Sequence, residues 1–575
     1  MAIQTLLSKL VPTLHEDNIL LAVNKPAGVD VGRIPNRPIT FNLVDTLAEA
    51  STGPGEGLFV TNRLARHESG VLLLAKDRGL ADHIRTGLKT GHVTQVYTIL
   101  LKGKMKGKHL LIQTGPSPPT TGKGRRDRGK VRSARADGAT EVVRLEVGET
   151  RTLVSCTTVA ENTHVLRAQL RSAGLHLVGD SRSAAGDAAK PPTTPHLHLS
   201  KVSFHHPARK SRLTVHCPLP GAFAASVGGH RPSNAPRGAE PSARSGDKTA
   251  PSTLLEQRLL TALLTRLECL LDEQTDSRRL LTGDAEGVPG LVVEKHGDIV
   301  IIQQRSPSPR KKPTPLRKIA QWYQRMLGTR AVYVKPFVKD TDGGRGGLTG
   351  PASSPEPLLG EPVAPEIVTS EQGLHFAIRP YEGLSVGLFL DQRENRRRVR
   401  ERAKGLDVLN LFAYTCGFSV AAAAGGAAST TSVDISTKSL EWGKRNFGLN
   451  GIDLSGHWFI RSSASDYFKR AKRQERSFDL IVIDAPSFAH GRKGKGSFSF
   501  KADMPDLLVG ALSVLNTDGI VMLSTNNRGI HARHLRQCVA QAAGSRHHKV
   551  IAAPRLPADF AVDPDHAKTI FVKFD

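Results

Sequence analysis

Short apolar runs alternate with helix-like segments through the last third of the chain. The apolar runs, each suited to one buried strand, lie at 407–412, 431–436, 478–486 and 519–527. Segments with helical periodicity lie between them, at 437–451 and 505–515. Strands that alternate with helices predict a parallel, doubly wound α/β sheet, here within 381–575. Such sheets bind ligands at the carboxyl ends of their strands.

Two earlier blocks of the chain have different patterns. Residues 1–220 carry strand-like apolar runs with few long helices, which predicts a mixed α+β domain. Residues 253–380 open with an apolar-periodic helix, and two short strands follow it around a His-Gly-Asp turn. This second pattern predicts a small central α+β domain that precedes the doubly wound sheet.

Polar or Gly/Pro-rich segments interrupt these blocks. They lie at 102–135, 221–252, 305–318 and 341–365. The first has eleven Lys or Arg residues and one Asp, and it holds too little apolar surface to fold alone, so we expect a basic, mobile insertion. The second is expected to be a disordered linker, and the last two are expected to be flexible loops of the central domain.

The composition indicates a basic protein with several domains. The 575 residues exceed what one hydrophobic core supports. Lys and Arg (80) outnumber Asp and Glu (53) by 27, an excess that favours polyanions such as RNA, DNA or an anionic membrane. The chain has neither an apolar run long enough to span a membrane nor a signal peptide's apolar stretch, and its five scattered cysteines fit no disulfide framework or zinc motif. We therefore expect a cytoplasmic, nucleic-acid-associated protein with no membrane span and no metal site.

Residues suited to ligand chemistry follow the C-terminal strands. Gly417 lies in the turn after the first strand, where backbone can approach a ligand closely. Asp434 ends the second strand, where a carboxylate can accept hydrogen bonds from a ribose diol, or could simply cap the next helix. Asp484 ends a later strand and is followed by Phe488, whose ring can stack on a base. Since there is no G-x-G-x-x-G motif, a dinucleotide site is not supported.

These segments resemble class I S-adenosylmethionine-dependent methyltransferases that modify 23S rRNA, of the RlmI/RlmK type. The matching segments are YEGLSVGLFLDQRENRRRV, DVLNLFAYTCGFSV, VDIS, SLEWGKRNFGLNG, FDLIVIDAPSF and STNNRG, and LLTGDAEGVPGLVVEKHGD resembles the same group's central domain. The resemblance implies a Rossmann-like domain with S-adenosylmethionine as cofactor. The residues it assigns to the cofactor are Phe389, Asp391, Arg393, Asn410, Phe412, Tyr414, Gly417, Asp434, Ser463 and Asp484. Cys416 stands where the family usually has Gly, and Ser463 where it has an acid that contacts adenine.

Two reactions remain open within this resemblance. Methylation of cytosine carbon 5 requires a cysteine thiolate, and neither strand-end segment, DAPSF or STNNRG, contains one. Guanine ring nitrogen 7 already has a lone pair, so positioning can supply the rate. STNNRGI also resembles the guanine group's ending, so guanine nitrogen 7 is expected and cytosine carbon 5 is the alternative. The residues expected at the reacting base are Asp484, Pro486, Phe488 and Asn526, of which Asn526 could also be an ordinary turn residue.

The N-terminal block resembles RluA-type pseudouridine synthases over residues 18–220. The matching segments are VNKPAGVDV, FVTNRLARHESGVLLLAKD, VTQVYTILLKG, NTHVLRAQLRSAGLHLVGDS and LHLSKVSFHHP. The family's His-Arg-Leu-Asp is Asn-Arg-Leu-Ala here, so Ala65 replaces the catalytic Asp, and Glu68 is expected to point elsewhere. The residues that the resemblance places beside RNA are Arg63, Tyr97 and Arg167. We expect an inactive domain kept for RNA binding; a purely structural domain is the alternative.

The combined expectation is a cytoplasmic enzyme that methylates a base of large-subunit rRNA, free or in a pre-ribosomal particle. Two other classes of function remain open. One is a nonenzymatic RNA-binding or ribosome-assembly factor, which the changes at Ser463 and Ala65 would suit. The other is an active pseudouridine synthase with an appended methyltransferase, against which Ala65 argues.

Overall fold

A computed structural model of the protein describes most of the chain. The described residues are 8–27, 29–31, 43–51, 57–113, 139–160, 162–179, 197–209, 211–220, 223, 253–272, 274–305, 315–337, 354–382, 385–485, 488–489 and 498–575. Most of the expected insertion 102–135 and linker 221–252, and parts of the loops 305–318 and 341–365, lie outside them. Three folded blocks were expected, whereas the structure forms two compact units, unit 1 (Met1–Glu268) and unit 2 (Cys269–Asp575).

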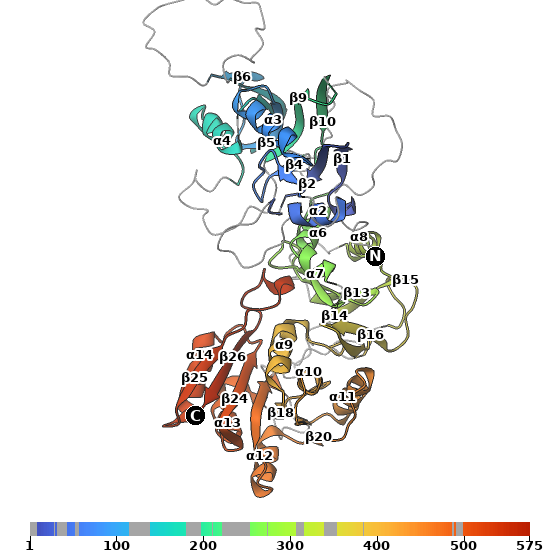
Figure 1. Ribbon diagram of the computed structural model, residues 1–575, viewed down its shortest axis with the longest axis vertical. Coiled ribbons are helices and arrows are strands. Elements are labelled where there is room, and N and C mark those ends of the chain that lie inside the picture. Colours follow the sequence, from blue (N-terminus) through green and yellow to red (C-terminus); the bar gives the residue numbers. More distant parts are fainter. Residues whose placement is uncertain are drawn as a thin grey trace, which may run out of the picture. The chain divides into compact units, whose positions relative to one another are not determined.

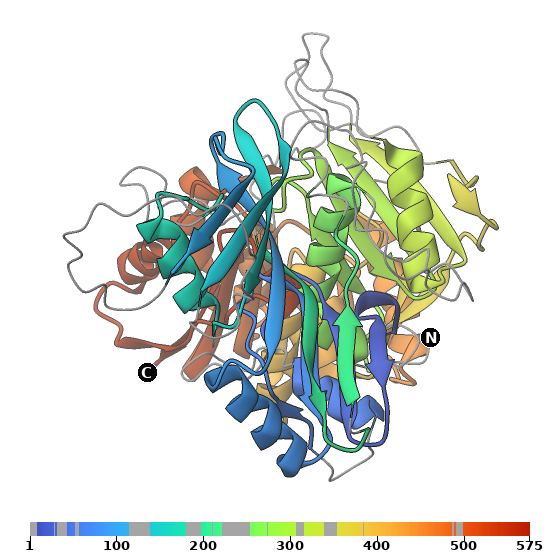
Figure 2. The same cartoon turned by 90° about the horizontal axis from the view of Figure 1, so that it is seen from above.

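Unit 1 is built on one ten-stranded mixed sheet, which confirms the expected class (Figure 1, Figure 2; blue to green). Its strands are β1 (Thr13–Glu16), β2 (Leu20–Lys25), β3 (Phe59–Val60), β4 (Ser69–Ala75), β5 (Thr94–Lys102), β6 (His109–Ile112), β7 (Thr140–Val147), β8 (Arg151–Thr158), β9 (Leu197–His206) and β10 (Ser211–His216). The order is β1-β2-β4-β9-β5-β8-β7-β6, with β10 on β9 and β3 on β4. The β4–β9 pair is parallel and the other pairs are antiparallel.

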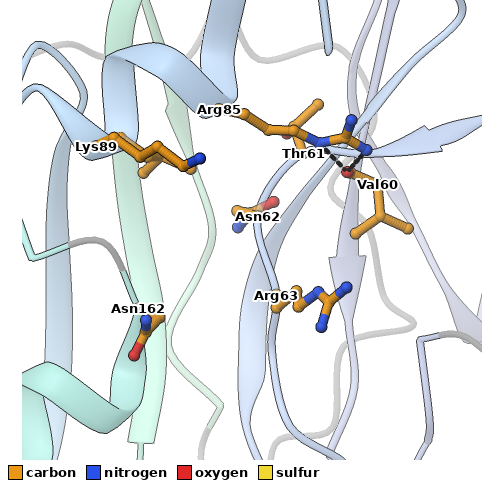
Figure 3. Close-up of a pocket in the computed structure, with 8 residues that line it drawn as sticks. Val60, Thr61, Asn62, Arg63, Arg85, Lys89 and Asn162 are labelled. Atoms are coloured by element: carbon orange, nitrogen blue, oxygen red, sulfur yellow. Dashed lines mark hydrogen bonds between the residues drawn. The ribbon is translucent and has the colours of Figure 1, made fainter. Parts of the chain in front are cut away.

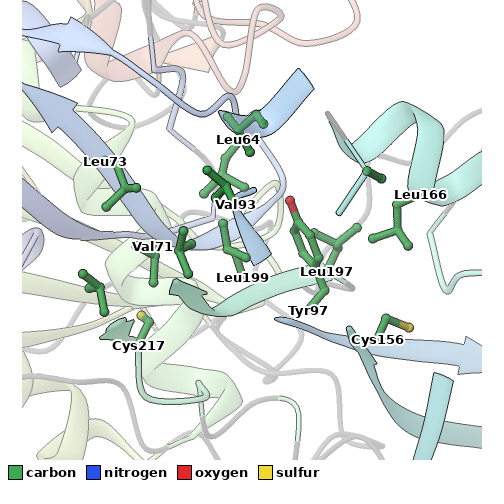
Figure 4. Close-up of a cluster of buried hydrophobic side chains, with 14 of the residues drawn as sticks. Leu64, Val71, Leu73, Val93, Tyr97, Cys156, Leu166, Leu197, Leu199 and Cys217 are labelled. Atoms are coloured by element: carbon green, nitrogen blue, oxygen red, sulfur yellow. The ribbon is translucent and has the colours of Figure 1, made fainter. Parts of the chain in front are cut away.

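The core of unit 1 lies around the central strands of this sheet. Every residue of β4 is buried, as its unbroken apolar run predicts for a central strand. The helices are α2 (Leu43–Ser51), α3 (Arg78–Lys89), α4 (Thr163–Ser172) and α6 (Leu254–Leu264). Asp77 caps α3, and Leu80, Ile84 and Leu88 bury one face of it. Figure 4 shows part of the resulting cluster of buried side chains.

Some segments expected to be disordered or to belong elsewhere are part of the folded structure. Strand β6 lies inside 102–135 and pairs with β7. Phe223, inside the expected linker, is fully buried against Leu100 and Leu153. Helix α6, expected to open the central domain, belongs to unit 1. Burying one Phe side chain contributes about 1.5–3 kcal/mol, so a single aromatic residue can anchor a segment of otherwise polar composition.

Unit 2 begins with a small sheet that corresponds to the expected central domain. Its strands are β11 (Arg278–Thr282), β12 (Leu291–His296), β13 (Ile299–Arg305), β14 (Ala331–Phe337) and β15 (Leu359–Gly360), in that order. Helix α7 (Leu267–Leu271) precedes the sheet, α8 (Leu316–Leu327) joins β13 to β14, and β16 (Ile367–Glu371) and β17 (Leu374–Ile378) form a separate hairpin. Val363, inside the expected loop 341–365, is buried in a core with Tyr333 and Phe376.

The rest of unit 2 is the expected doubly wound sheet. Its strands are β18 (Asp407–Leu411), β19 (Ser429–Asp434), β20 (His457–Arg461), β21 (Phe478–Asp484), β24 (Leu515–Thr525), β25 (His548–Ala552) and β26 (Lys568–Phe574), and β22 (Phe488–Ala489) and β23 (Phe498–Ser499) form a separate short hairpin. The order is β20-β19-β18-β21-β24-β26-β25. The first five are parallel, and β26 is antiparallel to both its neighbours. The chain reverses its direction of strand addition between β18 and β21, which makes the carboxyl ends of these strands the switch point of the sheet.

Helices cover both faces of this sheet (Figure 1). They are α9 (Arg393–Arg402), α10 (Gly417–Ala424), α11 (Thr437–Leu449), α12 (Ala464–Arg473), α13 (Phe500–Leu512) and α14 (Ala532–Ala543). Side chains of α9 and α10 pack on one face with Val408 and Leu480, and those of α12, α13 and α14 pack on the other with Leu409 and Ile481. Within the described residues, no helix combines the length and apolar character that a membrane span requires.

Candidate active site

The turn after β18 has an unusual backbone. Phe412, Tyr414 and Cys416 adopt left-handed conformations, with φ of 55°, 47° and 61°. Such conformations cost of order 1–3 kcal/mol each in non-glycine residues and persist only where the surroundings enforce them, typically around ligands. Here Thr415 Oγ1 donates to the carbonyl oxygen of Gly387 at 2.6 Å, and Asn446 Nδ2 donates to the carbonyl oxygen of Thr415 at 2.9 Å. The turn is therefore clamped from two sides.

Asp434 organises the same turn from the end of β19. One carboxylate oxygen accepts from the backbone N–H of Tyr414 at 2.8 Å, and the other accepts from that of Ser436 at 2.8 Å. Each carboxylate oxygen has two lone pairs, so one on each remains for a ligand's hydroxyl groups. Ser436, rather than Asp434, caps α11. The arrangement favours the ribose-binding interpretation of Asp434 over the helix cap.

Aromatic rings line this turn. The Phe389 ring lies 5.4 Å from the Tyr414 ring, which in turn lies 6.2 Å from that of Trp442. Phe389 is 43% exposed, although it is a large apolar side chain in a folded unit. An exposed ring beside a clamped turn offers an apolar wall to a ligand.

Two acidic residues, Asp391 and Asp484, lie near each other at the switch point. Gln392 Nε2 donates to Asp484 Oδ1 at 3.1 Å and to Ser524 Oγ at 3.0 Å, which ties the end of β21 to that of β24. Burial and the negative charge of buried Asp391 raise the pKa of Asp484 to about 7. On its other side, Asp391 Oδ2 lies 3.7 Å from His566 Nε2. The site therefore holds a carboxyl group poised between its neutral and ionised forms near neutral pH.

The shifted pKa of Asp484 predicts a pH effect on stability. Because the folded state favours the neutral acid, its contribution is full below the ordinary pKa of 3.8 and is lost as pH rises through about 7. We expect Asp484→Asn to flatten the decline in melting temperature between about pH 4 and pH 7, measured by thermal unfolding without cofactor. Asp466→Asn, at an exposed carboxylate, is the control. Parallel curves for the native protein and Asp484→Asn would contradict the assignment.

Other predicted site residues lie in different surroundings. Arg393 is buried and its guanidinium pairs with Asp559 at 2.8 Å and with Glu371 at 3.4 Å, so the structure gives it a role in holding unit 2 together and does not support cofactor contact. Ser463 caps α12, where its Oγ accepts from Asp466 N and donates to Asp466 Oδ2. Both side chains therefore already have hydrogen-bond or ion-pair partners within the described part of the chain.

The remaining predicted residues are distributed around the switch point. Asn410 is buried within β18 and donates to Ser419 Oγ at 2.9 Å, while its Oδ1 has no hydrogen-bond partner in the described structure. Gly417 begins α10, where an added Cβ would lie 3.4 Å from Arg396 Cδ. Asn526 is exposed just beyond β24. Pro486 lies outside the described residues, as does the side chain of Phe488.

The pattern of the sequence did not reveal a loop before β26 that also reaches the site. His566 lies 3.5 Å from Asp563 as well as near Asp391, and Asp563 pairs with Arg528, which follows β24. The only signal was the acid-rich stretch DFAVDPDH, which has no periodicity. Among the residues that the structure describes, no cluster of His, Cys, Asp or Glu could hold a metal ion.

In unit 1, the turn that carries Ala65 also holds a carboxylate, that of Glu68. Glu68 was expected to point elsewhere, but its side chain turns back, and Oε2 accepts from the backbone N–H of Ala65 at 2.8 Å. Its Oε1 accepts from Arg167 at 2.7 Å, with only 1% of the Glu68 side chain exposed. The fully buried Lys25 donates to the carbonyl oxygens of Ala65 and Glu68, and burial lowers its pKa to about 7.

This network changes the interpretation of two predicted RNA contacts. Tyr97 is 2% exposed and its hydroxyl donates to Gln95, so it lies in the core and not on an RNA-facing surface. The Arg167 guanidinium is engaged by Glu68 and His67. Of the three predicted contacts, only Arg63 is exposed to solvent.

The sheet order, the switch point and the clamped turn define a Rossmann-like methyltransferase. The profile of the S-adenosylmethionine-dependent methyltransferases matches residues 348–571, and that of the RNA pseudouridylate synthases matches residues 19–172. Asp434, the exposed Phe389 and the unpaired oxygen of buried Asn410 fit such a cofactor, which supplies an electrophilic methyl group when bound.

Sequence comparison with known proteins identifies the family of the chain more closely. The chain is 30% identical to a ribosomal RNA large subunit methyltransferase of Deinococcus radiodurans, over 52% of this chain and 73% of the relative. It is 44% identical to ribosomal RNA large subunit methyltransferase K of Neisseria meningitidis, over 28% of this chain but only 46% of the relative. The chain belongs to the S-adenosylmethionine-dependent methyltransferase family that includes these ribosomal RNA large subunit methyltransferases.

Two solved structures have a low similarity to the chain. A SAM-dependent methyltransferase from Streptococcus mutans is 27% identical, with 54% of this chain and 78% of that chain covered and a TM-score of 0.47. Human RNA pseudouridylate synthase domain containing 4 is 22% identical, with 39% and 95% covered and a TM-score of 0.30.

Proposed function

We propose that the protein transfers a methyl group from S-adenosylmethionine to a base of large-subunit rRNA in the cytoplasm. The main observation behind this proposal is that Asp434, at the switch point of the sheet, accepts a hydrogen bond from the backbone of the clamped turn. The chain also belongs to a methyltransferase family and is related to ribosomal RNA methyltransferases. The net charge of +27 suits a polyanionic substrate. Transfer of labelled methyl groups to large-subunit rRNA, both deproteinised and within the pre-ribosomal particle, tests it. Absence of transfer to both substrates by a protein that binds the cofactor would contradict it.

Guanine ring nitrogen 7 is the acceptor atom that the site supports best. The alternative, cytosine carbon 5, needs a reactive thiolate. Cys416 is fully buried in the clamped turn after β18, and burial raises its pKa to about 12. Burial also raises the pKa of Cys538, in α14. Neither thiol is therefore suited to attack a pyrimidine ring.

In this mechanism the residues of the chain position the base and form no covalent bond with it. Asp484 can accept or donate a hydrogen bond at a base edge, because its pKa of about 7 gives it both protonation states near neutral pH. Pro486, Phe488 and Asn526 are proposed to complete the base pocket, with the Phe488 ring stacking on the base. Alignment of the nitrogen lone pair with the methyl group is worth effective molarities of about 10⁵ M or more.

The proposed acceptor, guanine nitrogen 7, leads to a prediction for variants without cysteine. If no thiolate attacks the base, replacing all five cysteines with alanine should leave methyl transfer within about tenfold of the native rate, whereas loss of a nucleophile would abolish it. The measurement is the initial rate on rRNA, with cofactor affinity as the control for folding. A single Cys→Ala variant that binds cofactor normally but no longer transfers methyl groups would restore the cytosine alternative.

Unit 1 is proposed to bind RNA without making pseudouridine. Ala65 has no nucleophile, and the carboxylate of Glu68 is buried, bound by Arg167 and by the Ala65 N–H. We expect no tritium release from rRNA labelled at uridine carbon 5 by the full-length protein, under conditions where methyl transfer is measurable. Release that is lost in Glu68→Gln would mean that Glu68 has replaced the missing aspartate.

A further inference from the structure

A cavity of about 400 Å³ lies in unit 1 beside the turn that carries Ala65. One wall follows β3 and includes Asn62 and Arg63, and the other is the face of α3 that carries Arg85 and Lys89. Figure 3 shows the three cationic side chains around Asn62. This volume is in the range of pockets that hold small organic ligands.

The neutral polar groups of this cavity are already satisfied. Asn62 donates to the carbonyl oxygen of Val71 at 2.9 Å and accepts from Leu73 N at 2.8 Å. The side-chain oxygen of Asn162 caps α4 through the N–H groups of His164 and Val165. The groups left to recognise a ligand are therefore mainly the cations.

The cations outnumber the acids around the cavity. Arg85 donates to the carbonyl oxygen of Val60 and lies 3.5 Å from Asp82, whose side chain is 74% exposed. Among the described residues, Arg63 and Lys89 have no hydrogen-bond or ion-pair partner, and no carboxylate lines the cavity. Arg85 and Lys89 stand at i and i+4 of α3, where like charges destabilise a helix by about 0.2–0.5 kcal/mol.

We propose that this cavity binds a phosphodiester group of the RNA substrate through Arg63, Arg85 and Lys89. Arg and Lys are the side chains that hold phosphate oxygens. Among the residues that the structure describes, no aromatic side chain lines the cavity to stack on a base. The contact is therefore to the RNA backbone, and it fixes the position of the RNA on unit 1 without reading its sequence.

This inference rests on the proposed rRNA substrate, and the salt dependence of binding tests it. The full-length protein, deproteinised large-subunit rRNA and a salt titration are used. Each phosphate contact contributes about 0.7–0.9 to the log–log slope. We expect the Arg63→Ala/Lys89→Ala double variant to lose about 0.7–0.9 of slope, which is the contribution of the one phosphate that the cavity binds. Lys89→Arg, which keeps the charge, should keep the slope, and cofactor affinity should be unchanged in both.

Lys108→Ala provides a control, because Lys108 is also an exposed lysine of unit 1 and does not line the cavity. A double variant whose loss of slope is no larger than that of Lys108→Ala would overturn the inference while leaving the rRNA substrate in place. No rRNA binding by the native protein would instead contradict the proposed function itself. Calorimetric binding of AMP or inorganic phosphate that Lys89→Ala abolishes, with an unchanged rRNA slope, would assign the cavity to a free phosphate ligand and overturn the RNA assignment.

Discussion

Replacing Gly443 with alanine is expected to destabilise unit 2 by about 2 kcal/mol. Gly443 lies in α11, and an added Cβ would come within 2.3 Å of Cys416 Sγ and 2.8 Å of Cys416 Cβ. Cys416 cannot move aside easily, because it is fully buried and its backbone is left-handed. Overpacking of this kind costs about 1–3 kcal/mol or more, and the gain in helix propensity of about 1 kcal/mol offsets only part of it. The measurement is the free energy of unfolding from denaturant titration.

The same helix provides the control, and Cys416 provides the rescue. Gly448→Ala, also in α11, meets no atom within 4 Å and should leave stability unchanged or raise it by up to about 1 kcal/mol. Adding Cys416→Gly to Gly443→Ala removes both clashing atoms and restores glycine at a left-handed position, so most of the loss should be recovered. Equal stabilities of Gly443→Ala and Gly448→Ala would show that Cys416 is not held against α11.

Asp434→Ala is expected to weaken S-adenosylmethionine binding by about 1.5–3 kcal/mol, or roughly 10- to 150-fold. The change removes the acceptor for the ribose hydroxyls and also frees the Tyr414 N–H, so the turn loses one of its anchors. Calorimetric titration of the full-length protein measures the effect. Asp466→Ala is the control, because that exposed carboxylate contacts only Ser463 and Lys469 among the described interactions.

The Asp434 result also separates the classes of function. An affinity within twofold of the native value would remove Asp434 from the cofactor site. A native protein that binds no S-adenosylmethionine at all would favour the assembly-factor alternative, in which the site has decayed. The melting temperature of Asp434→Ala, compared with those of the native protein and Asp466→Ala, separates a folding defect from a loss of affinity.

The sequence predicted the doubly wound sheet because its signals are local. A short apolar run such as 478–484 is typical of a buried strand, and an acid at its end lies at the edge where parallel sheets bind ligands. For that reason the sequence could place Asp434 and Asp484 at strand ends, where the structure has them. The identity of a residue at a strand end and the direction of the strand are both readable from a single sequence.

Features that depend on long-range contacts could not be predicted in this way. The fold-back of Glu68 depends on Arg167, and the burial of Arg393 depends on Asp559, both about a hundred or more residues away in sequence. Phe223 stands in a polar linker with no periodicity around it. The left-handed turn of Phe412 and Tyr414 has no glycine at those positions to signal it.

Nucleoside mass spectrometry of large-subunit rRNA tests the central claim most directly. rRNA from a strain that lacks the gene is compared with rRNA from the same strain complemented with the native gene or with the Asp434→Ala variant. We predict that 7-methylguanosine at one position is lost in the deletion, restored by the native gene and reduced with Asp434→Ala, while the pseudouridine content stays the same. An rRNA methylation pattern that is identical in all these strains would contradict the account.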